Sequence, residues 1–270
     1  MKAFKIFFDF FNDLFSNRHL IWELVRRDMK ISYVGSFLGI LWTFIHPFAL
    51  TMIFMLIFGI GFQAGAPVGD VPFFIWFLAG YIPWVFFSST VLTNAECIKS
   101  FDYLVKKINF RISVIPLIKV FSNIVILFFY LLSLLFFIFF WDVPLSIYIF
   151  QLFYYFVAMF ILVMGFSYLF SSTNVFIKDI GNINSIVLQL GFFATPIFWK
   201  LDSVSPTYRF LFELNPMVYI IQGFRDSLFN RVPFWVHTTE TIYFWLFTVV
   251  VLILGVIVFD KLRPHFADVI

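Results

Sequence analysis

The 270-residue chain is 62% hydrophobic and only 12% charged, with a net charge of +3 at pH 7. Soluble domains carry about 25% charged residues, so this composition indicates a protein with several membrane-spanning segments. The single cysteine, Cys97, excludes an internal disulfide and a cysteine-based metal site. The four histidines are scattered without an HExxH-type pair, so no metal site is predicted.

Two amphipathic helices are expected before the first membrane span, within residues 1–33. The first alternates phenylalanine with charged residues so that the rings share one side of a helical wheel, which is typical of a helix lying on the inner leaflet. The second, about 18–33, carries a basic arc of Arg26, Arg27 and Lys30. We interpret this arc as a membrane-surface anchor, or alternatively as a docking site for a cytoplasmic partner or an anionic lipid headgroup.

Six membrane spans are predicted from apolar runs that can cross a hydrocarbon core of about 30 Å. They cover residues 37–61, 73–95, 114–140, 146–170, 183–199 and 242–259, and the fifth is only marginally long enough. The N-terminal segment, the loop at 96–113 and the tail at 260–270 are rich in Lys and Arg, so both termini are expected in the cytoplasm. The segment at 200–241 is then expected outside, and the whole chain is expected to form one all-α transmembrane domain.

The cytoplasmic loop at 96–113 is long for a connector between two spans, and it has an apolar face and a basic face. It is predicted to form one amphipathic helix that contacts a partner, although an ordinary basic connector is the alternative. The candidate contact residues are Lys99, Phe101, Tyr103, Lys106 and Lys107.

The segment before the last span is divided by three prolines into pieces of about ten residues. A ten-residue helix rises only about 15 Å, half of a bilayer core, so short re-entrant helices are expected here. We predict an extracellular gate in which Arg225 pairs with a carboxylate such as Glu213 or Asp226. The candidate gate residues are Glu213, Asn215, Pro216, Arg225 and Asp226.

No catalytic constellation is found in the sequence. It has no GxxxxGK[ST] motif, and no glycine is followed by lysine, so the chain is not expected to bind ATP phosphates itself. Lys119 is the only charged residue inside the predicted spans, and Glu96 and Asp260 directly follow two of them, which argues against a proton-coupled or ion-coupled transporter. If the protein moves a substrate, the energy is expected to come from another subunit.

Three regions of the sequence carry a family likeness. The first is RRDMKISYVGSFLGILWTFIHPF at 26–48, and the second is VFIKDIGNI at 175–183. The third comprises Thr195-Pro196-Ile197, Asn215-Pro216-Met217 and Gly223-Phe224-Arg225. In this order, and with this arrangement of spans, the chain resembles the membrane subunit (permease) of a type-2 ABC polysaccharide exporter, the group that moves O-antigen of lipopolysaccharide, teichoic acid and capsular chains.

The resemblance implies a transport subunit of the bacterial cytoplasmic (inner) membrane and not an enzyme. Two copies of the chain would pair around a central pathway, and two separate ATP-binding cassette subunits would hold ATP and magnesium, so that no cofactor is bound by this chain. The 96–113 helix would be the coupling helix, with the 18–33 helix beside it. The family's usual substrate is a long glycan on an undecaprenyl-type lipid, and nucleic acid is not an expected partner.

Aromatic rings can stack on sugar faces without reading their sequence, which suits a channel for a polymer. The candidate channel aromatics are Trp42, Phe44, Phe48, Trp76 and Tyr81. The alternative for each is a ring that faces lipid or the membrane interface.

Two other functions stay open at this point. The substrate could be a drug or another amphiphile, which would need a smaller, closed cavity. A membrane glycosyltransferase would require clustered acidic residues, whereas Asp70, Asp142 and Asp202 are isolated in the sequence.

Overall fold

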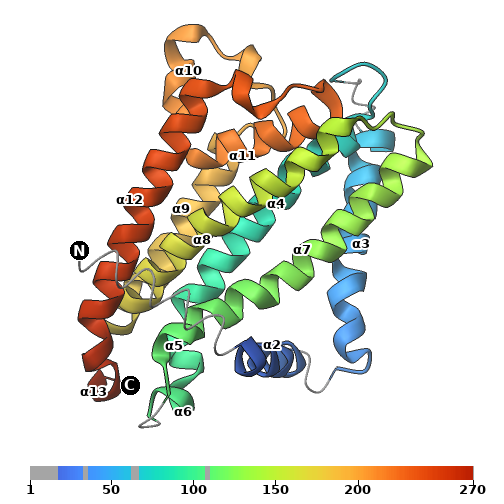
Figure 1. Ribbon diagram of the computed structural model, residues 1–270. Coiled ribbons are helices and arrows are strands. Elements are labelled where there is room, and N and C mark those ends of the chain that lie inside the picture. Colours follow the sequence, from blue (N-terminus) through green and yellow to red (C-terminus); the bar gives the residue numbers. More distant parts are fainter. Residues whose placement is uncertain (1–17, 33–35, 62–66, 107–109, 270) are drawn as a thin grey trace.

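The computed structural model describes residues 18–32, 36–61, 67–106 and 110–269, and this part of the chain is helical without a β-strand (Figure 1). The amphipathic helix expected near the N-terminus, and the candidate residue Lys107, lie outside the described residues. Within the described ranges, five helical stretches are long and apolar enough to cross a membrane: Trp42–Gly59, Phe73–Ala95, Ile112–Phe140, Ile147–Phe176 and Thr238–His265.

These stretches coincide with five of the six predicted spans. They contain α3 (Trp42–Met55) with its π-helical continuation (Leu56–Gly61), α4 (Phe73–Ala95), α7 (Ile115–Phe140), α8 (Gln151–Phe176) and α12 (Thr238–Leu262). The predicted fifth span corresponds to α9 (Asp179–Ala194), which has 16 residues and is not among the five.

Short helices gather at two opposite ends of the bundle (Figure 1). The α2 end holds α2 (Arg18–Ser32), α5 (Cys97–Ser100), α6 (Asp102–Val105) and α13 (Phe266–Val269). The α10 end holds α10 (Pro206–Glu213) and α11 (Pro216–Arg225), which continues in a π-helical turn, Asp226–Asn230. Single 3-10 turns precede several helices: Gly39–Leu41, Ile112–Val114, Ile147–Phe150, Leu201–Ser203, Phe234–Val236 and Arg263–His265.

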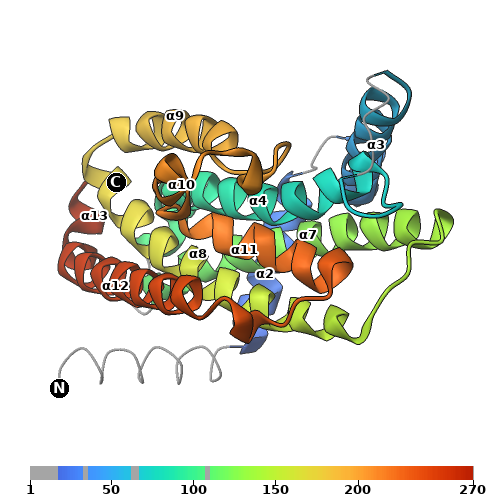
Figure 2. The same cartoon turned by 90° about the horizontal axis from the view of Figure 1, so that it is seen from above.

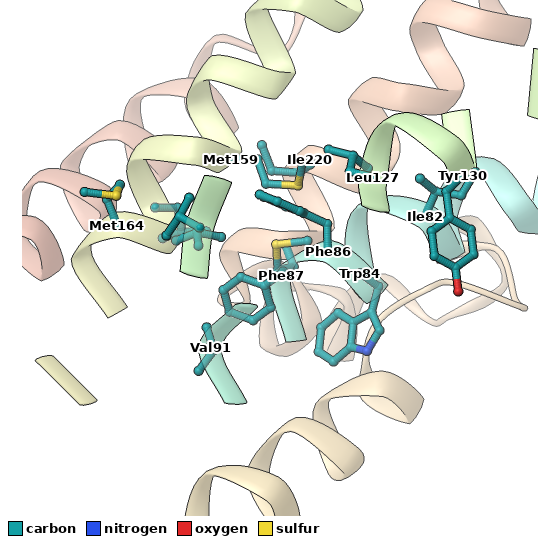
Figure 3. Packing of buried hydrophobic residues seen from close by; sticks show 14 of the residues in the cluster. Ile82, Trp84, Phe86, Phe87, Val91, Leu127, Tyr130, Met159, Met164 and Ile220 are labelled. Atoms are coloured by element: carbon teal, nitrogen blue, oxygen red, sulfur yellow. The ribbon is translucent and has the colours of Figure 1, made fainter. Parts of the chain in front are cut away.

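Helix α4 forms the centre of the bundle. It is apolar all round, as expected of a helix with neighbours on every side, and 72% of the residues in its most hydrophobic stretch are buried. Figure 3 shows Ile82, Phe86 and Val91 of α4 among side chains from three other helices, including Leu127 of α7 and Ile220 of α11. The central helix therefore links the spans to the short helices of the α10 end.

Helices α8 and α12 pack closely because two glycines face each other. A Cβ atom on Gly255 would lie 2.4 Å from the carbonyl oxygen of Gly165, and one on Gly165 would lie 2.8 Å from the backbone nitrogen of Leu252. Such distances leave no room for a side chain at either position. Small residues at a helix crossing let two backbones meet in a membrane, where apolar side chains alone provide little driving force.

Helix α3 lies at the edge of the bundle, as seen from above in Figure 2. Only 17% of the residues in its hydrophobic stretch are buried, and its main neighbour among the long helices is α7. The hydroxyls of Thr51 on α3 and Ser133 on α7 lie 3.3 Å apart inside this contact. Much of the apolar surface of α3 is therefore free to meet lipid or another chain.

Candidate functional site

The α2 end presents a surface that depends on the packing of α2 against α7. Ile21 and Leu24 lie on the buried face of α2. Asp28 is buried on the same face, and its carboxylate accepts hydrogen bonds from Lys119 Nζ at 2.5 Å and from Ser122 Oγ at 2.8 Å, both on α7. Because a buried carboxylate requires such partners, this contact fixes the rotation of α2 about its axis.

That rotation exposes the basic arc predicted from the sequence. Arg26, Arg27 and Lys30 all point away from the bundle. The guanidinium carbon of Arg27 lies 4.8 Å from the ring centroid of Tyr103 on α6, a cation–π contact between two predicted partner-binding elements. We call the joint surface, made up of Arg26, Arg27, Lys30, Tyr103 and Lys106, the coupling surface.

The 96–113 segment is not one continuous helix, contrary to the prediction. It forms the two four-residue helices α5 and α6, and Phe101 between them has φ −110° and ψ 31°, outside the α-helical region. The prediction of a surface role for Phe101 is also wrong, because its side chain is only 3% exposed. The ring centroid of Phe101 lies 5.5 Å from Lys119 Nζ of α7. The helix therefore breaks at the residue whose ring is buried inside the bundle.

The basic residues of this segment that the structure describes all keep some exposure to solvent. Lys106, the residue that follows α6, is exposed and lies 3.9 Å from Asp102 at the start of that helix, while Lys99 is half-buried. An exposed pair of this kind is worth little for stability. The pair of Lys106 with Asp102 therefore contributes little to the stability of the fold.

The turn between α8 and α9 belongs to the same end of the bundle and contains the second region of family likeness. Asn174 donates a hydrogen bond from Nδ2 to the carbonyl of Ala95 at 2.7 Å and accepts one at Oδ1 from the backbone N–H of Gly181 at 3.1 Å. One buried amide thus connects the last turn of α4, the end of α8 and the start of α9. No sequence pattern had indicated this role for Asn174.

The five candidate channel aromatics do not form a single ring-lined surface within one chain. Trp42 and Phe44 are exposed on α3, and Phe48 stacks on Phe44 with centroids 5.8 Å apart. Tyr81 is half-buried on α4. Trp76 is only 3% exposed and its ring is covered by an arginine, which corrects its assignment as an open channel residue.

At the α10 end, the short helices predicted from the prolines are present. Pro206 and Pro216 each occupy the first turn of a helix, where the missing N–H of proline has no consequence. The side chain of Asn215 caps α11 by accepting a hydrogen bond from the N–H of Met217 at 3.0 Å. It also donates to Thr195 Oγ1 at 2.9 Å, so two motifs of the third region of likeness are in contact.

Arg225 is the most deeply buried charged side chain of this end, at 1% exposure. It donates hydrogen bonds to the carbonyls of Pro196 and Ile197, both at 2.6 Å, and its guanidinium carbon lies 3.4 Å from the ring centroid of Trp76. Gly80 makes room for this fork, since a Cβ atom there would lie 2.8 Å from Nη2.

The expected pairing of Arg225 with a carboxylate is therefore wrong. Among the described residues, Glu213 instead lies 3.9 Å from Arg209, and Asp226 lies 3.1 Å from His237. The physical reason is that the backbone after α9 leaves two adjacent carbonyls without helical partners, and a planar guanidinium matches two such acceptors.

Asp226 is held by three side chains, of which sequence reasoning found none. Gln222 and Asn230, one turn before and after it, donate to Oδ1 at 3.2 and 2.7 Å, and His237 approaches Oδ2. Burial raises the pKa of Asp226, and the contacts with Asn230 and His237 oppose that effect. The spacing of Gln222 and Asn230 could have suggested the helical pairs, whereas His237 follows an irregular turn and had no such signal.

A cavity of about 280 Å³ opens between α10, α11 and α12. Three candidate gate residues, Glu213, Arg225 and Asp226, line it together with residues from the loop at 67–71 and from the start of α12. The structure thus gathers most of the charged residues of the α10 end around one space. No cluster of three or more His, Cys, Asp or Glu with metal-binding geometry occurs in the described ranges.

Residues 19–229 match the ABC-2 type transporter family, which is most of the chain. The chain belongs to this family. The match begins within α2 and ends at the π-helical turn after α11, so it includes both the coupling surface and the α10 end. As a member of the family, the transporter is a transport subunit and not an enzyme.

Curated relatives match the transporter over most of their length. The chain is 29% identical over 236 residues to the O-antigen export system permease protein RfbA of Myxococcus xanthus, covering 82% of this chain and 85% of the relative. Two proteins of the same name from Klebsiella pneumoniae are 25% and 24% identical, each covering 93% of this chain and 95% of the relative.

Proposed function

We propose that this chain is the membrane-spanning subunit of an ATP-driven exporter of a lipid-linked polysaccharide, of the O-antigen or teichoic-acid type, in the bacterial cytoplasmic membrane. The observation that carries the proposal is the coupling surface: a chain of an ABC transporter family, with no P-loop sequence, exposes a basic face built jointly from α2 and α6. The relatives named as O-antigen export permeases support the substrate class.

The distribution of basic residues supports an orientation with the α2 end in the cytoplasm. At the α10 end the described Lys and Arg residues are Lys200, Arg209, Arg225 and Arg231, and each has acidic neighbours in the sequence. Those at the α2 end are more numerous and include Arg26, Arg27, Lys30, Lys99, Lys106, Arg111, Lys119, Lys178, Lys261 and Arg263. Both termini are then cytoplasmic.

In this orientation the coupling surface is the docking site for a separate ATPase subunit. The ion pair of Asp28 with Lys119 fixes α2 on α7, and the ring of Phe101 fixes α5 and α6 against the same lysine. A movement of the ATPase at the coupling surface would therefore be transmitted to α7, a full membrane span. An element that couples ATP hydrolysis to transport requires such a rigid connection between the coupling surface and a membrane span.

We propose six membrane crossings, with α9 as the short fifth crossing. Its 16 residues rise about 24 Å, and the chain continues through 195–199 toward the α10 end. Helices α10 and α11 rise only about 12 and 15 Å, which supports a re-entrant, gate-like segment at the outer surface. Irregular backbone at this depth is tolerated only beside protein or water, and the contacts of Arg225 with two carbonyls meet that condition.

A second copy of the chain completes the pathway in this proposal. Figure 2 shows α3 and α9 on the same side of α4, and both carry exposed apolar side chains such as Trp42, Ile186 and Leu190. Tyr81 of α4 lies between them, with ring contacts to Phe54 of α3 at 4.9 Å and to a ring of α9. We place the glycan pathway along this side, where Trp42 and Phe44 present open rings.

The test is co-expression of the chain with an ATP-binding cassette subunit from the same genome. Charge reversal of Lys106 and Arg27 to glutamate should abolish co-purification of the ATPase and surface display of the glycan, while the chain still inserts into the membrane. Lys261→Glu, an exposed lysine on α12, is the matched control and should change neither. ATP hydrolysis by the chain alone, or unchanged co-purification of the double variant, would refute the proposal.

The substrate class is tested separately. In a strain that lacks this chain, lipid-linked glycan should accumulate on the cytoplasmic side, and drug sensitivity should be unchanged. The opposite pattern, with normal glycan display and increased sensitivity to amphiphilic drugs, would favour the drug-exporter alternative.

A further inference from the structure

Helix α9 has two exposed faces of different chemistry. The apolar face presents Ile186 and Leu190, which are 59% and 65% exposed. The polar face presents Asn182, Ser185 and Gln189, which are also exposed and follow one another at the spacing of one helix side. None of these three side chains has a hydrogen-bond partner among the described residues. Since hydrocarbon cannot satisfy amide and hydroxyl groups, a polar face on a membrane helix has to meet water or another polar surface.

The polar face of α9 lies on the side of this helix that is turned toward α3. Phe192 of α9 contacts the ring of Tyr81 on α4, with centroids 6.3 Å apart, and Phe54 of α3 contacts the same ring at 4.9 Å. Ser185 precedes Phe192 by seven residues, about two full turns, and therefore lies on the same side of the helix. The polar face thus borders the side of α4 on which both α3 and α9 lie (Figure 2).

His46 is the corresponding polar residue of α3. It is exposed, although it lies within the apolar stretch Trp42–Gly59. Phe48, two residues later, stacks on Phe137 of α7 with centroids 6.2 Å apart. Positions two apart on a helix point in nearly opposite directions, so His46 is turned away from α7. A titratable side chain inside a membrane span almost always faces protein or a water-filled space, which indicates that this side of α3 does not face lipid.

We propose that Asn182, Ser185 and Gln189 of α9, together with His46 of α3, form a water-facing wall of the transport pathway, an inference that rests on the proposed function. The water-facing wall begins near the α2 end, because Asn182 lies in the first turn of α9. The apolar face of α9 stays in contact with hydrocarbon. One helix thereby separates the hydrated pathway from the lipid.

The water-facing wall is polar but carries almost no charge. From 180 to 194 the sequence of α9 has no Asp, Glu, Lys or Arg. Amide and hydroxyl groups donate and accept hydrogen bonds without a net charge, so water or an uncharged polar substrate can exchange along them. A charged group would meet a countercharge only at His46, and only while the imidazole is protonated. The water-facing wall therefore suits the uncharged part of a polar substrate.

The test measures the access of water to single cysteines, introduced into a Cys97→Ser background and studied in inside-out membrane vesicles that contain the chain with its ATP-binding cassette subunit. A thiol reacts as the thiolate, which forms in water and not in hydrocarbon. Gln189→Cys should therefore react with an impermeant thiol reagent about tenfold faster than its neighbour Leu190→Cys. Ser185→Cys and Ile186→Cys form a second pair of neighbours at another depth, with the same difference expected.

Two further variants test α3 and the link to transport. His46→Cys should react faster than Met52→Cys, a residue that is also exposed on α3 but lies on another side of the helix. Complete modification of Gln189→Cys with a bulky, permeant thiol reagent should lower glycan export at least about tenfold, because the added group stands in the pathway. The Cys97→Ser background, treated with the same reagent, is the control and should export normally.

The outcomes separate the water-facing wall from the proposed function. Equal reaction rates on the two faces of α9, or slow reaction at both polar positions, would overturn the wall even where glycan is exported. Disulfide formation between two copies at Gln189→Cys, together with slow labelling, would also overturn it, because the polar face would then be a contact between copies. Unchanged export after modification of Gln189→Cys would overturn its place in the pathway. The expected labelling in a complex that exports no glycan would support the hydrated face and refute the exporter.

Discussion

Replacing Arg225 with methionine removes the side chain that connects α11 to the backbone after α9. Pro196 and Ile197 are buried, and their carbonyls receive the two guanidinium hydrogen bonds at 2.6 Å. A buried polar group that loses its partner costs about 1–3 kcal/mol. Loss of both bonds and of the stacking on Trp76, partly offset by burial of the methionine side chain, should lower the free energy of unfolding by about 2–5 kcal/mol.

The single cysteine of the chain provides the assay. Cys97 is buried, so a thiol-reactive fluorophore should label it only as the protein unfolds on heating in detergent. Arg225→Met should shift this labelling transition to a clearly lower temperature. Arg209→Met is the matched control in the same cavity, because Arg209 pairs with the exposed Asp202 and such pairs contribute at most about 1 kcal/mol.

A second substitution tests the same contact from the other side. Gly80→Ala places a Cβ atom 2.8 Å from the guanidinium, so it should destabilise the unmodified chain but cost much less once Arg225 is methionine. Equal transition temperatures for Arg225→Met and Arg209→Met, or full additivity of the Gly80 and Arg225 substitutions, would refute the reasoning.

Three further predictions follow from contacts described above. Gly255→Leu should prevent close packing of α8 on α12 and reduce the yield of folded protein, whereas Gly59→Leu, with open space around its Cβ position, should not; equal yields would contradict the packing argument. Single cysteines introduced into a Cys97→Ser background should react with an impermeant thiol reagent from outside readily at Ser203, which is exposed, and poorly at Asn215, which caps α11; strong labelling at both would indicate a solvated loop instead of a gate. Phe101→Ala should destabilise the whole fold by about 3–5 kcal/mol, and a loss confined to ATPase binding would restore a surface role for this ring.

The long helices were predictable because their signal is local. The apolar run at 73–95 coincides with α4, since a continuous run of this length has few alternatives to a membrane helix. The basic arc of α2 was predicted for a similar reason: a helix has one periodicity, and the residues that do not fit the apolar face must be exposed. Patterns of this kind need no knowledge of distant parts of the chain.

The partners of the charged residues were not predictable, because they lie far away in the sequence and become neighbours only in the folded chain. Glu213 and Asp226 are near Arg225 in sequence, yet the guanidinium binds carbonyls almost thirty positions earlier, where a helix end left acceptors free. The break at Phe101 had no local cause either. An amphipathic pattern predicts a helix, but the space for one buried ring beside Lys119 exists only after α7 has packed.

The two facing glycines of α8 and α12 also bear on how the protein is made. Helix α12 is the last long helix to be synthesised, and until it arrives the surface around Gly165 has no partner that fits so closely. Without α12, the surface of α8 around Gly165 would face lipid instead of the backbone of a neighbouring helix. The close backbone contact of α8 can therefore form only after α12 has been inserted beside it.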